Sequence, residues 1–241
     1  GMAFLFTFFL LPIFNLAQTS TQTSTGETGG YQQSLRFSNY FDAFMENREQ
    51  FGRSFLYATI ATVLALAIAY PLAYFAARYA KGKWKAVFYL LIMLPLWSSY
   101  LVKVYAWKLI LAKEGIITWA TDATHTSGIL NALLSLPVIG GSSLSTSYIG
   151  MFLVFTYVWL PYMILPMQAA LERVPTSMIE ASQDLGATRA QTFRTVILPL
   201  ALPGVIAGSI FTFSLTMGDY IIPQIVGNSA NFIGIDRKSV V

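Results

Sequence analysis

Residues 55–77 form an apolar stretch without a charged side chain, and four similar stretches lie elsewhere in the chain. A helix that crosses a bilayer needs about 20 mostly apolar residues, so such stretches predict membrane spans. The predicted spans are about 2–16, 55–77, 86–112, 148–171 and 200–217. Only 11% of the residues are charged, against about 25% in soluble domains. We therefore expect an all-α integral membrane protein with about five spans in one domain, 1–241.

The composition also excludes several classes of function. The chain has no Cys and a single His, which excludes disulfides, thiolate metal sites and cysteine nucleophiles. An intramembrane enzyme would need paired Asp residues or a His–Glu cluster within the spans, and neither is present. We predict no catalytic residue, no cofactor and no metal site. The net charge of +4 comes from basic residues in short loops, so nucleic acid is not an expected partner.

The basic residues predict the orientation of the spans. The loop 78–85 contains no acid and four basic residues, namely Arg78, Lys81, Lys83 and Lys85. The positive-inside rule places this loop in the cytoplasm. The loop 172–199 and the N-terminus then also lie in the cytoplasm, whereas 17–54 and 113–147 lie outside.

The two ends of the chain do not fit a complete set of spans. The stretch 2–16 begins directly after Gly1, and it is short for a hydrocarbon core of about 30 Å. Five spans would leave Arg237 and Lys238 outside, which conflicts with the positive-inside rule. A sixth helix would remove the conflict. We expect that the chain is truncated at both ends and that this sixth helix is missing.

The polar loop 172–199 begins with the pattern of a short capped helix. Ser177 and Glu180 have the spacing of a capping box, which predicts a helix that begins at Met178. Gly186 suits the position just past the end of this helix, because glycine accepts a left-handed backbone conformation there.

A second capped helix follows in the same loop. Thr188 and Gln191 repeat the capping spacing, which predicts a helix that runs toward Leu198. One face of the first helix combines small and apolar residues at helical spacing: Met178, Ala181, Ser182 and Leu185. Small residues allow another protein to approach closely. The alternative is an ordinary amphipathic connector that lies on the lipid headgroups.

The loop resembles the EAA loop of ABC-importer permeases. The matching pattern is E-A-x-x-x-x-G, nine residues, and then (V/I)-x-L-P. It is carried by Glu180, Ala181, Gly186, Val196, Leu198 and Pro199. Ser182 departs from the pattern, since Ala is usual there. In that family the loop is the coupling helix that docks into the ATPase subunit. The resemblance implies a role in ATPase coupling for Met178, Glu180, Ala181, Ser182, Leu185, Gly186 and Pro199.

Three further segments, 70–75, 94–107 and 218–224, resemble permeases of the same family. The last two are similar to the spermidine/putrescine branch, in which Arg is usual at the position of Lys103. The resemblance implies a MetI-like bundle, which usually has six helices.

Two ionisable residues are candidates for contact with a transported substrate. Lys103 lies within the predicted span 86–112, and Asp219 follows the last span. Charged groups at membrane depth are costly and usually face a pathway or a partner. Aromatic candidates for cation–π contacts are Trp97, Tyr100, Tyr105 and Trp107. The alternatives are that Asp219 caps a turn, that the aromatic residues form an interface belt, and that a break near Pro95 brings Lys103 to the outer interface.

Together these features predict a transmembrane subunit of an ABC importer in a bacterial inner membrane. The sequence has no G-x-x-x-x-G-K-[ST] phosphate loop, so a separate ATPase dimer would bind the ATP. A substrate-binding protein and a second permease subunit are the other expected partners. Gly204 and Gly208 allow close helix packing, with that second subunit as one candidate. Polyamines are the expected cargo. Iron, thiamine or an oxyanion are alternatives, and a secondary transporter is a rival from another class.

Overall fold

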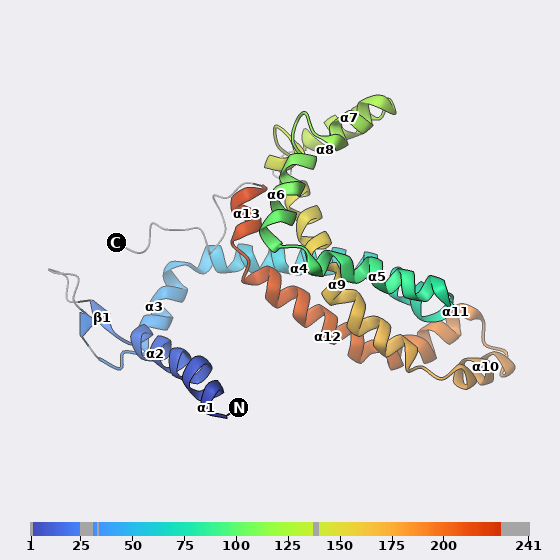
Figure 1. Cartoon of the computed structure of the whole chain (residues 1–241), viewed down its shortest axis with the longest axis horizontal. Coiled ribbons are helices and arrows are strands. Elements are labelled where there is room, and N and C mark those ends of the chain that lie inside the picture. The colour runs from blue at the N-terminus through green and yellow to red at the C-terminus, as the bar shows by residue number, and fades with distance from the viewer. Residues whose placement is uncertain (1, 25–30, 33, 137–139, 228–241) are drawn as a thin grey trace. The chain divides into compact units, whose positions relative to one another are not determined.

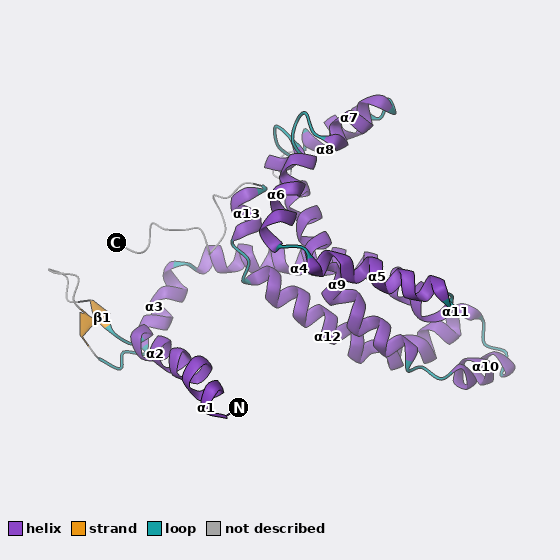
Figure 2. Ribbon diagram, in the orientation of Figure 1, coloured by secondary structure: helices purple, strands orange, loops and turns teal. Residues whose placement is uncertain are grey.

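The computed structural model describes residues 2–24, 31–32, 34–136 and 140–227, and most of them are helical (Figures 1 and 2). The chain divides into two compact units, Gly1–Phe51 and Gly52–Val241. Arg237 and Lys238, which carry the predicted conflict at the C-terminus, lie outside the described residues.

The first unit contains short elements. Three consecutive helical segments, α1 (Met2–Leu5), the π-helical turn η1 (Phe6–Leu10) and α2 (Leu11–Ser20), cover the predicted span 2–16 and continue beyond it. The apolar helix Phe6–Ser20 is shorter than a typical span. The two-residue strands β1 (Thr23–Ser24) and β2 (Tyr31–Gln32) pair antiparallel.

Helix α3 (Ser38–Glu46) completes this unit and is amphipathic. Its exposed large apolar residues recur at helical spacing, and with the preceding Phe37 they are Tyr40, Phe41, Phe44 and Met45. Such a face is typical of a helix that lies at a membrane surface.

Within the described residues, three helices are long and apolar enough to cross a membrane: α4 (Arg48–Arg78), α9 (Tyr148–Glu172) and the continuous helix Arg189–Met217. The last of these comprises α11 (Arg189–Thr192), the π-helical turn η3 (Phe193–Ile197) and α12 (Leu198–Met217). They contain the predicted spans 55–77, 148–171 and 200–217. The all-α membrane fold expected from the sequence is confirmed.

The segment expected as one helix over 86–112 is divided in two. Helix α5 (Lys83–Trp97) and helix α6 (Tyr100–Ile110) meet at an angle of 98°. Ser98 and Ser99 form the break, with extended ψ angles of 147° and 137°. Serine side chains compete for backbone hydrogen bonds, and the Ser98 hydroxyl donates to the carbonyl of Pro95 at 3.0 Å. Two helices that are each short for a span therefore replace one long helix.

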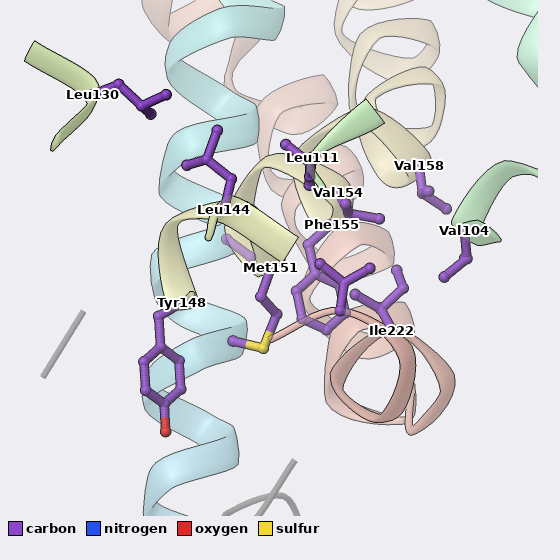
Figure 3. Packing of buried hydrophobic residues seen from close by; sticks show 12 residues of the cluster. Val104, Leu111, Leu130, Leu144, Tyr148, Met151, Val154, Phe155, Val158 and Ile222 are labelled. Carbon is purple, nitrogen blue, oxygen red and sulfur yellow. The ribbon is translucent and has the colours of Figure 1, made fainter. Parts of the chain in front are cut away.

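The 3₁₀ turn η2 (Leu144–Thr146), α6 and α13 (Ile221–Ile225) pack on α9, whose first half carries the buried residues of this region. Helices α7 (Ile116–Ala123) and α8 (Ser127–Leu134) pack against each other, and Leu130 of α8 reaches the same apolar cluster. Met151 and Phe155 of α9 are fully buried here, together with Val104 of α6 and Ile222 of α13 (Figure 3). This cluster fixes α6 and α13 on α9. Helix α6 carries the candidate substrate residues Tyr100, Lys103 and Tyr105, and Asp219 lies just before α13.

A second apolar cluster lies around the other half of α9. Helix α4 contributes a stripe of fully buried alanines, of which Ala65, Ala69 and Ala73 belong to this cluster. Met163 and Met167 of α9 fill the space that these small side chains leave. The cluster extends to Ile197, close to the start of α12, and so connects the core to the polar loop that precedes α12.

Helix α12 packs directly against α9 along the two glycines. A Cβ atom on Gly204 would meet Ala170 and would lie 2.5 Å from the carbonyl oxygen of Pro166. A Cβ atom on Gly208 would lie 2.9 Å from the carbonyl oxygen of Met163. The close helix packing expected from G-x-x-x-G is confirmed, and the partner is α9 of the same chain. These glycines therefore do not need a second subunit to explain them.

Candidate functional site: the α10–α11 element and the Tyr100–Asp219 pocket

Helix α10 (Thr176–Asp184) lies at one extreme of the second unit, between the end of α9 and α11 (Figure 1). It begins earlier than the predicted start at Met178. Pro175 holds the N-cap position with φ −64° and ψ 136°, and no side chain caps the helix. Because the helix begins directly after this proline, Ser177 lies inside the first turn, where it cannot act as the cap. The predicted Ser177–Glu180 capping box is therefore wrong.

The end of α10 follows the prediction. Gly186 adopts φ +84°, in the left-handed region. Its amide donates to the carbonyl of Gln183 at 2.9 Å, and the amide of Ala187 donates to the carbonyl of Ser182 at 3.1 Å. This pair of bonds is a Schellman motif, which satisfies the last carbonyls of the helix and turns the chain sharply. The predicted role of Gly186 in ending the helix is confirmed.

The second helix also begins as predicted. The Gln191 amide donates to the Thr188 hydroxyl at 3.3 Å, and the Thr188 amide donates to the Gln191 side-chain oxygen at 2.8 Å. From this capping box the helix runs without interruption into α12. Pro199 lies in the first turn of α12, directly after the π-helical turn η3. Proline has no amide hydrogen to donate to the preceding turn, and it is tolerated in this position.

The outward face of α10 is only partly the predicted one. Leu185 is 88% exposed and Met178 is 49% exposed, and Ala181 and Glu180 are also exposed. Ser182 instead turns toward α11, where its hydroxyl lies 3.1 Å from that of Thr192. Ser182 therefore holds the two helices together and does not belong to the outward face.

The backbone between α9 and α10 is attached to α4. The guanidinium of Arg78 donates through Nη2 to the carbonyl oxygen of Val174 at 3.0 Å. Val174 is nearly fully buried. From the sequence, Arg78 indicated only the orientation of the loop 78–85, and its contact with Val174 was not predicted.

The end of α9 is attached to α5 through Glu172. Its carboxylate oxygen Oε1 lies 2.9 Å from Nζ of Lys85, and it accepts hydrogen bonds from Tyr89 at 2.9 Å and from Gln168 at 3.3 Å. The sequence contains a signal for this contact, namely one acid at the end of an apolar helix, on the same side as a purely basic loop. Sequence reasoning did not use it.

A cavity of about 450 Å³ is lined by residues of α10, α4 and α11. It is lined on one side by Ile179 and Glu180 of α10 and on the other by Tyr74, Arg78 and Arg189. Helix α10 therefore has open space on part of its inner side, although its two ends are fixed.

A second site lies beyond the other end of α12, where Asp219 is only 8% exposed. Its Oδ1 accepts hydrogen bonds from the amides of Ile221 at 2.9 Å and Ile222 at 3.2 Å, and Oδ2 accepts one from the hydroxyl of Tyr100. Burial raises the pKa of Asp219, and these hydrogen bonds lower it. The carboxylate thus caps the short helix α13, as the structural alternative anticipated.

Asp219 and Tyr100 also line a pocket of about 320 Å³. The ring of Trp159 in α9 stacks on Tyr100 with centroids 5.8 Å apart, and Tyr220 lines the same pocket. Trp159 was not among the predicted site residues, because nothing in the sequence relates α9 to α6. A carboxylate beside stacked aromatic rings has the chemistry to bind an organic cation.

The remaining predicted substrate residues lie elsewhere. Lys103 donates through Nζ to the carbonyl of Pro95 at 2.9 Å, so it caps the end of α5 at the helix break. Trp97 is 83% exposed and Tyr105 is 54% exposed. None of these three lines the Tyr100–Asp219 pocket. Among the residues that the structure describes, no group of three His, Asp or Glu side chains is placed to hold a metal ion.

Comparison with known proteins gives relatives that are all named as transport permeases. The chain is 56% identical over 182 residues to the inner membrane ABC transporter permease protein YdcU of Escherichia coli, covering 76% of this chain and 58% of that protein. It is 30% identical over 223 residues to the spermidine/putrescine transport system permease protein PotB of Haemophilus influenzae, covering 92% of this chain and 73% of that protein.

A third relative is named for a different cargo. The chain is 32% identical over 163 residues to a probable molybdenum ABC transporter permease of Haloferax volcanii, covering 68% of this chain and 53% of that protein. The chain thus spans somewhat more than half the length of two of these three relatives.

A family of permease components matches residues 69–236, which include α10, α11 and the Tyr100–Asp219 pocket. Because that match covers most of the chain, this protein belongs to the family of binding-protein-dependent transport system inner membrane components.

Proposed function

We propose that this chain is a transmembrane subunit of a bacterial ABC importer and that α10 and α11 bind a separate ATPase. The observation that carries the proposal is the outward face of α10, with Leu185 almost fully exposed on a helix whose two ends are fixed. A scattered exposed leucine needs no explanation. An exposed leucine at the end of a helix anchored on both sides, in a family named for binding-protein-dependent transport, favours a protein interface.

The proposed mechanism is alternating access driven by the partner. Closure of the ATPase dimer displaces α10, and the permease helices rearrange to open toward the outside. The basic loop 78–85 and the α10–α11 element then face the cytoplasm, as does the N-terminus. A substrate-binding protein delivers the cargo, and a second, related permease subunit completes the pathway. The chain itself hydrolyses no ATP.

The proposed cargo is a polyamine such as spermidine or putrescine. Relatives named for these polyamines are about 30% identical to this chain, and the pocket that contains Tyr100, Trp159 and Asp219 combines a carboxylate with aromatic rings. A molybdenum-type oxyanion is the second candidate, because one relative is named for molybdenum. An anion would be disfavoured next to the Asp219 carboxylate, which supports the polyamine.

The interface is tested by charge reversal on α10. The Glu180→Lys variant is expressed with its ATPase, its partner permease and its binding protein, and the co-purified ATPase is measured. Glu114→Lys is the matched control, since Glu114 is an exposed acid in the turn between α6 and α7. We expect Glu180→Lys to lose most of the ATPase and of the uptake, and Glu114→Lys to retain both. Normal assembly and uptake by Glu180→Lys would reject the interface.

The cargo and the class of transporter are tested together in liposomes. The purified complex is supplied with labelled putrescine, labelled spermidine or molybdate, with and without ATP. We expect ATP-dependent uptake of a polyamine only. Uptake of molybdate alone would favour the oxyanion, and uptake by the isolated chain without ATPase would identify a secondary transporter.

A further inference from the structure

Helix α10 is connected to the membrane helices through only three residues on its N-terminal side, 173–175, between Glu172 and Thr176. Two polar attachments hold this link. Arg78, the last residue of α4, binds the backbone of the link at Val174. Lys85 and Tyr89 of α5 bind Glu172, the last residue of α9. The two attachments come from different helices and reach the link within three residues of each other.

The link is rigid where it is attached. Val174 is 3% exposed and Leu171 is fully buried, so the backbone there cannot swing freely. Helix α10 itself borders the 450 Å³ cavity, which leaves room for it to move on its inner side. On its N-terminal side, a force on α10 therefore reaches the chain first at Val174 and Glu172.

We propose that Arg78 and Glu172 are positioning residues that transmit the displacement of α10 to α4 and α5. This inference rests on the proposed function, since it needs an ATPase that moves α10. Arg78 transmits the displacement to the end of α4, whose alanine stripe packs on α9. Glu172 transmits it to α5, which ends at the sharp break at Ser98 and Ser99 before α6. Helix α6 carries Tyr100 of the substrate pocket, so the path through Glu172 links the two sites.

The attachments are suited to transmission without being essential for folding. The side chains of Lys85 and Glu172 are 38% and 30% exposed, and partly exposed ion pairs add little to stability. Their removal should leave a folded and assembled complex. A defect would then appear in how efficiently ATP hydrolysis drives transport, which a purely stabilising contact would not alter.

The test compares variants at both ends of the ion pair with adjacent controls. The Glu172→Gln and Lys85→Gln variants are assembled with their partners in liposomes, and the cargo transported per ATP hydrolysed is measured. The controls are Arg173→Gln and Lys83→Gln, which change exposed charges next to each partner. Neither control residue has a side-chain hydrogen bond or ion pair in the described part of the chain.

We expect both test variants to retain assembly and ATPase activity and to lower the transport ratio at least threefold, while the controls stay within error. The charge-swapped double variant Lys85→Glu with Glu172→Lys should recover most of the ratio. Arg78→Gln should lower the ratio as well, because it loses the bond to Val174.

Two results would overturn the proposal. One is an unchanged transport ratio in Glu172→Gln and Arg78→Gln; the other is an equal loss in the Arg173→Gln control. Failure of the proposed function gives a different pattern, in which the wild-type chain neither binds an ATPase nor transports with ATP.

Discussion

The exposure of polar and apolar groups differs between the two ends of the continuous helix Arg189–Met217, which contains α12. Before this helix, Leu185 at the end of α10 is 88% exposed, and Glu180 is exposed at the cavity beside α10. After it, Asp219 is 8% exposed, and both of its carboxylate oxygens accept hydrogen bonds from the same chain. The first end leaves its functional groups open to another molecule, whereas the second satisfies them internally and offers a small pocket.

The α10 end and the Asp219 end therefore support their proposed functions by different observations, an exposed surface and a buried carboxylate. An open face on an anchored helix is available to the proposed macromolecular partner, and covering it would remove apolar surface from water. A buried carboxylate with internal partners has a complete structural explanation, so a role in substrate binding must be shown by experiment.

The largest effect is expected from Gly186→Val. The positive φ of Gly186 costs a β-branched residue about 1–2 kcal/mol, although no atom would clash with the new Cβ. The turn between α10 and α11 should change its conformation. The amount of co-purified ATPase should then fall about tenfold, because a loss of about 1.4 kcal/mol of binding free energy lowers an affinity tenfold.

Two control variants isolate the backbone effect at this position. Gly186→Asn should be tolerated far better, because asparagine accepts the left-handed region. Gly128→Ala, at a site with open space and no positive φ, should behave as the wild type. Full ATPase recovery with Gly186→Val would show that the turn does not define the interface.

A smaller effect is expected at the other end, from Asp219→Asn. Asparagine can still cap α13, but it carries no charge for a cationic cargo. We expect the KM for spermidine to rise several-fold with little change in thermal stability. An unchanged KM would leave Asp219 as a helix cap alone. Asp219→Ala removes the cap too and should lower stability by about 1 kcal/mol.

The smallest effect is expected from Tyr100→Phe, which removes one hydroxyl and keeps the stacked ring. Asp219 Oδ2 then loses the donor that the structure gives it. Thermal unfolding in detergent should show a loss of about 1 kcal/mol, and uptake should change less than in Asp219→Asn. A larger uptake defect in Tyr100→Phe than in Asp219→Asn would mean that the hydroxyl, and not the carboxylate, contacts the cargo.

The sequence predicted those features that depend on neighbours along the chain. The capping box at Thr188 and the left-handed Gly186 are set by residues within one turn, and both are confirmed. The start of α10 was predicted at the wrong residue, because the fixed backbone of Pro175 outweighs the capping pattern at Ser177. The G-x-x-x-G motif predicted close packing correctly, but it could not name α9 as the partner.

Features that depend on contacts between distant parts of the chain could not be predicted from the sequence. Tyr100 and Asp219 are separated by 119 residues, and only the bend at Ser98 and Ser99 and the packing on α9 bring them together. Trp159 was missed for the same reason. Lys103 was predicted as a pathway residue from its depth in the span 86–112, with a break near Pro95 as the alternative. The structure contains a break at Ser98 and Ser99 and gives Lys103 the carbonyl of Pro95 as a partner.

The central claim, that α10 binds the ATPase, is tested most directly by cross-linking. The chain has no cysteine, so Leu185→Cys creates a unique thiol on the outward face of α10, and Glu114→Cys places one in the turn between α6 and α7. Each variant is assembled with its ATPase and treated with a short thiol-to-amine cross-linker. A covalent permease–ATPase product from position 185 and none from position 114 is the predicted result. No product from position 185, or equal products from both positions, would contradict the account.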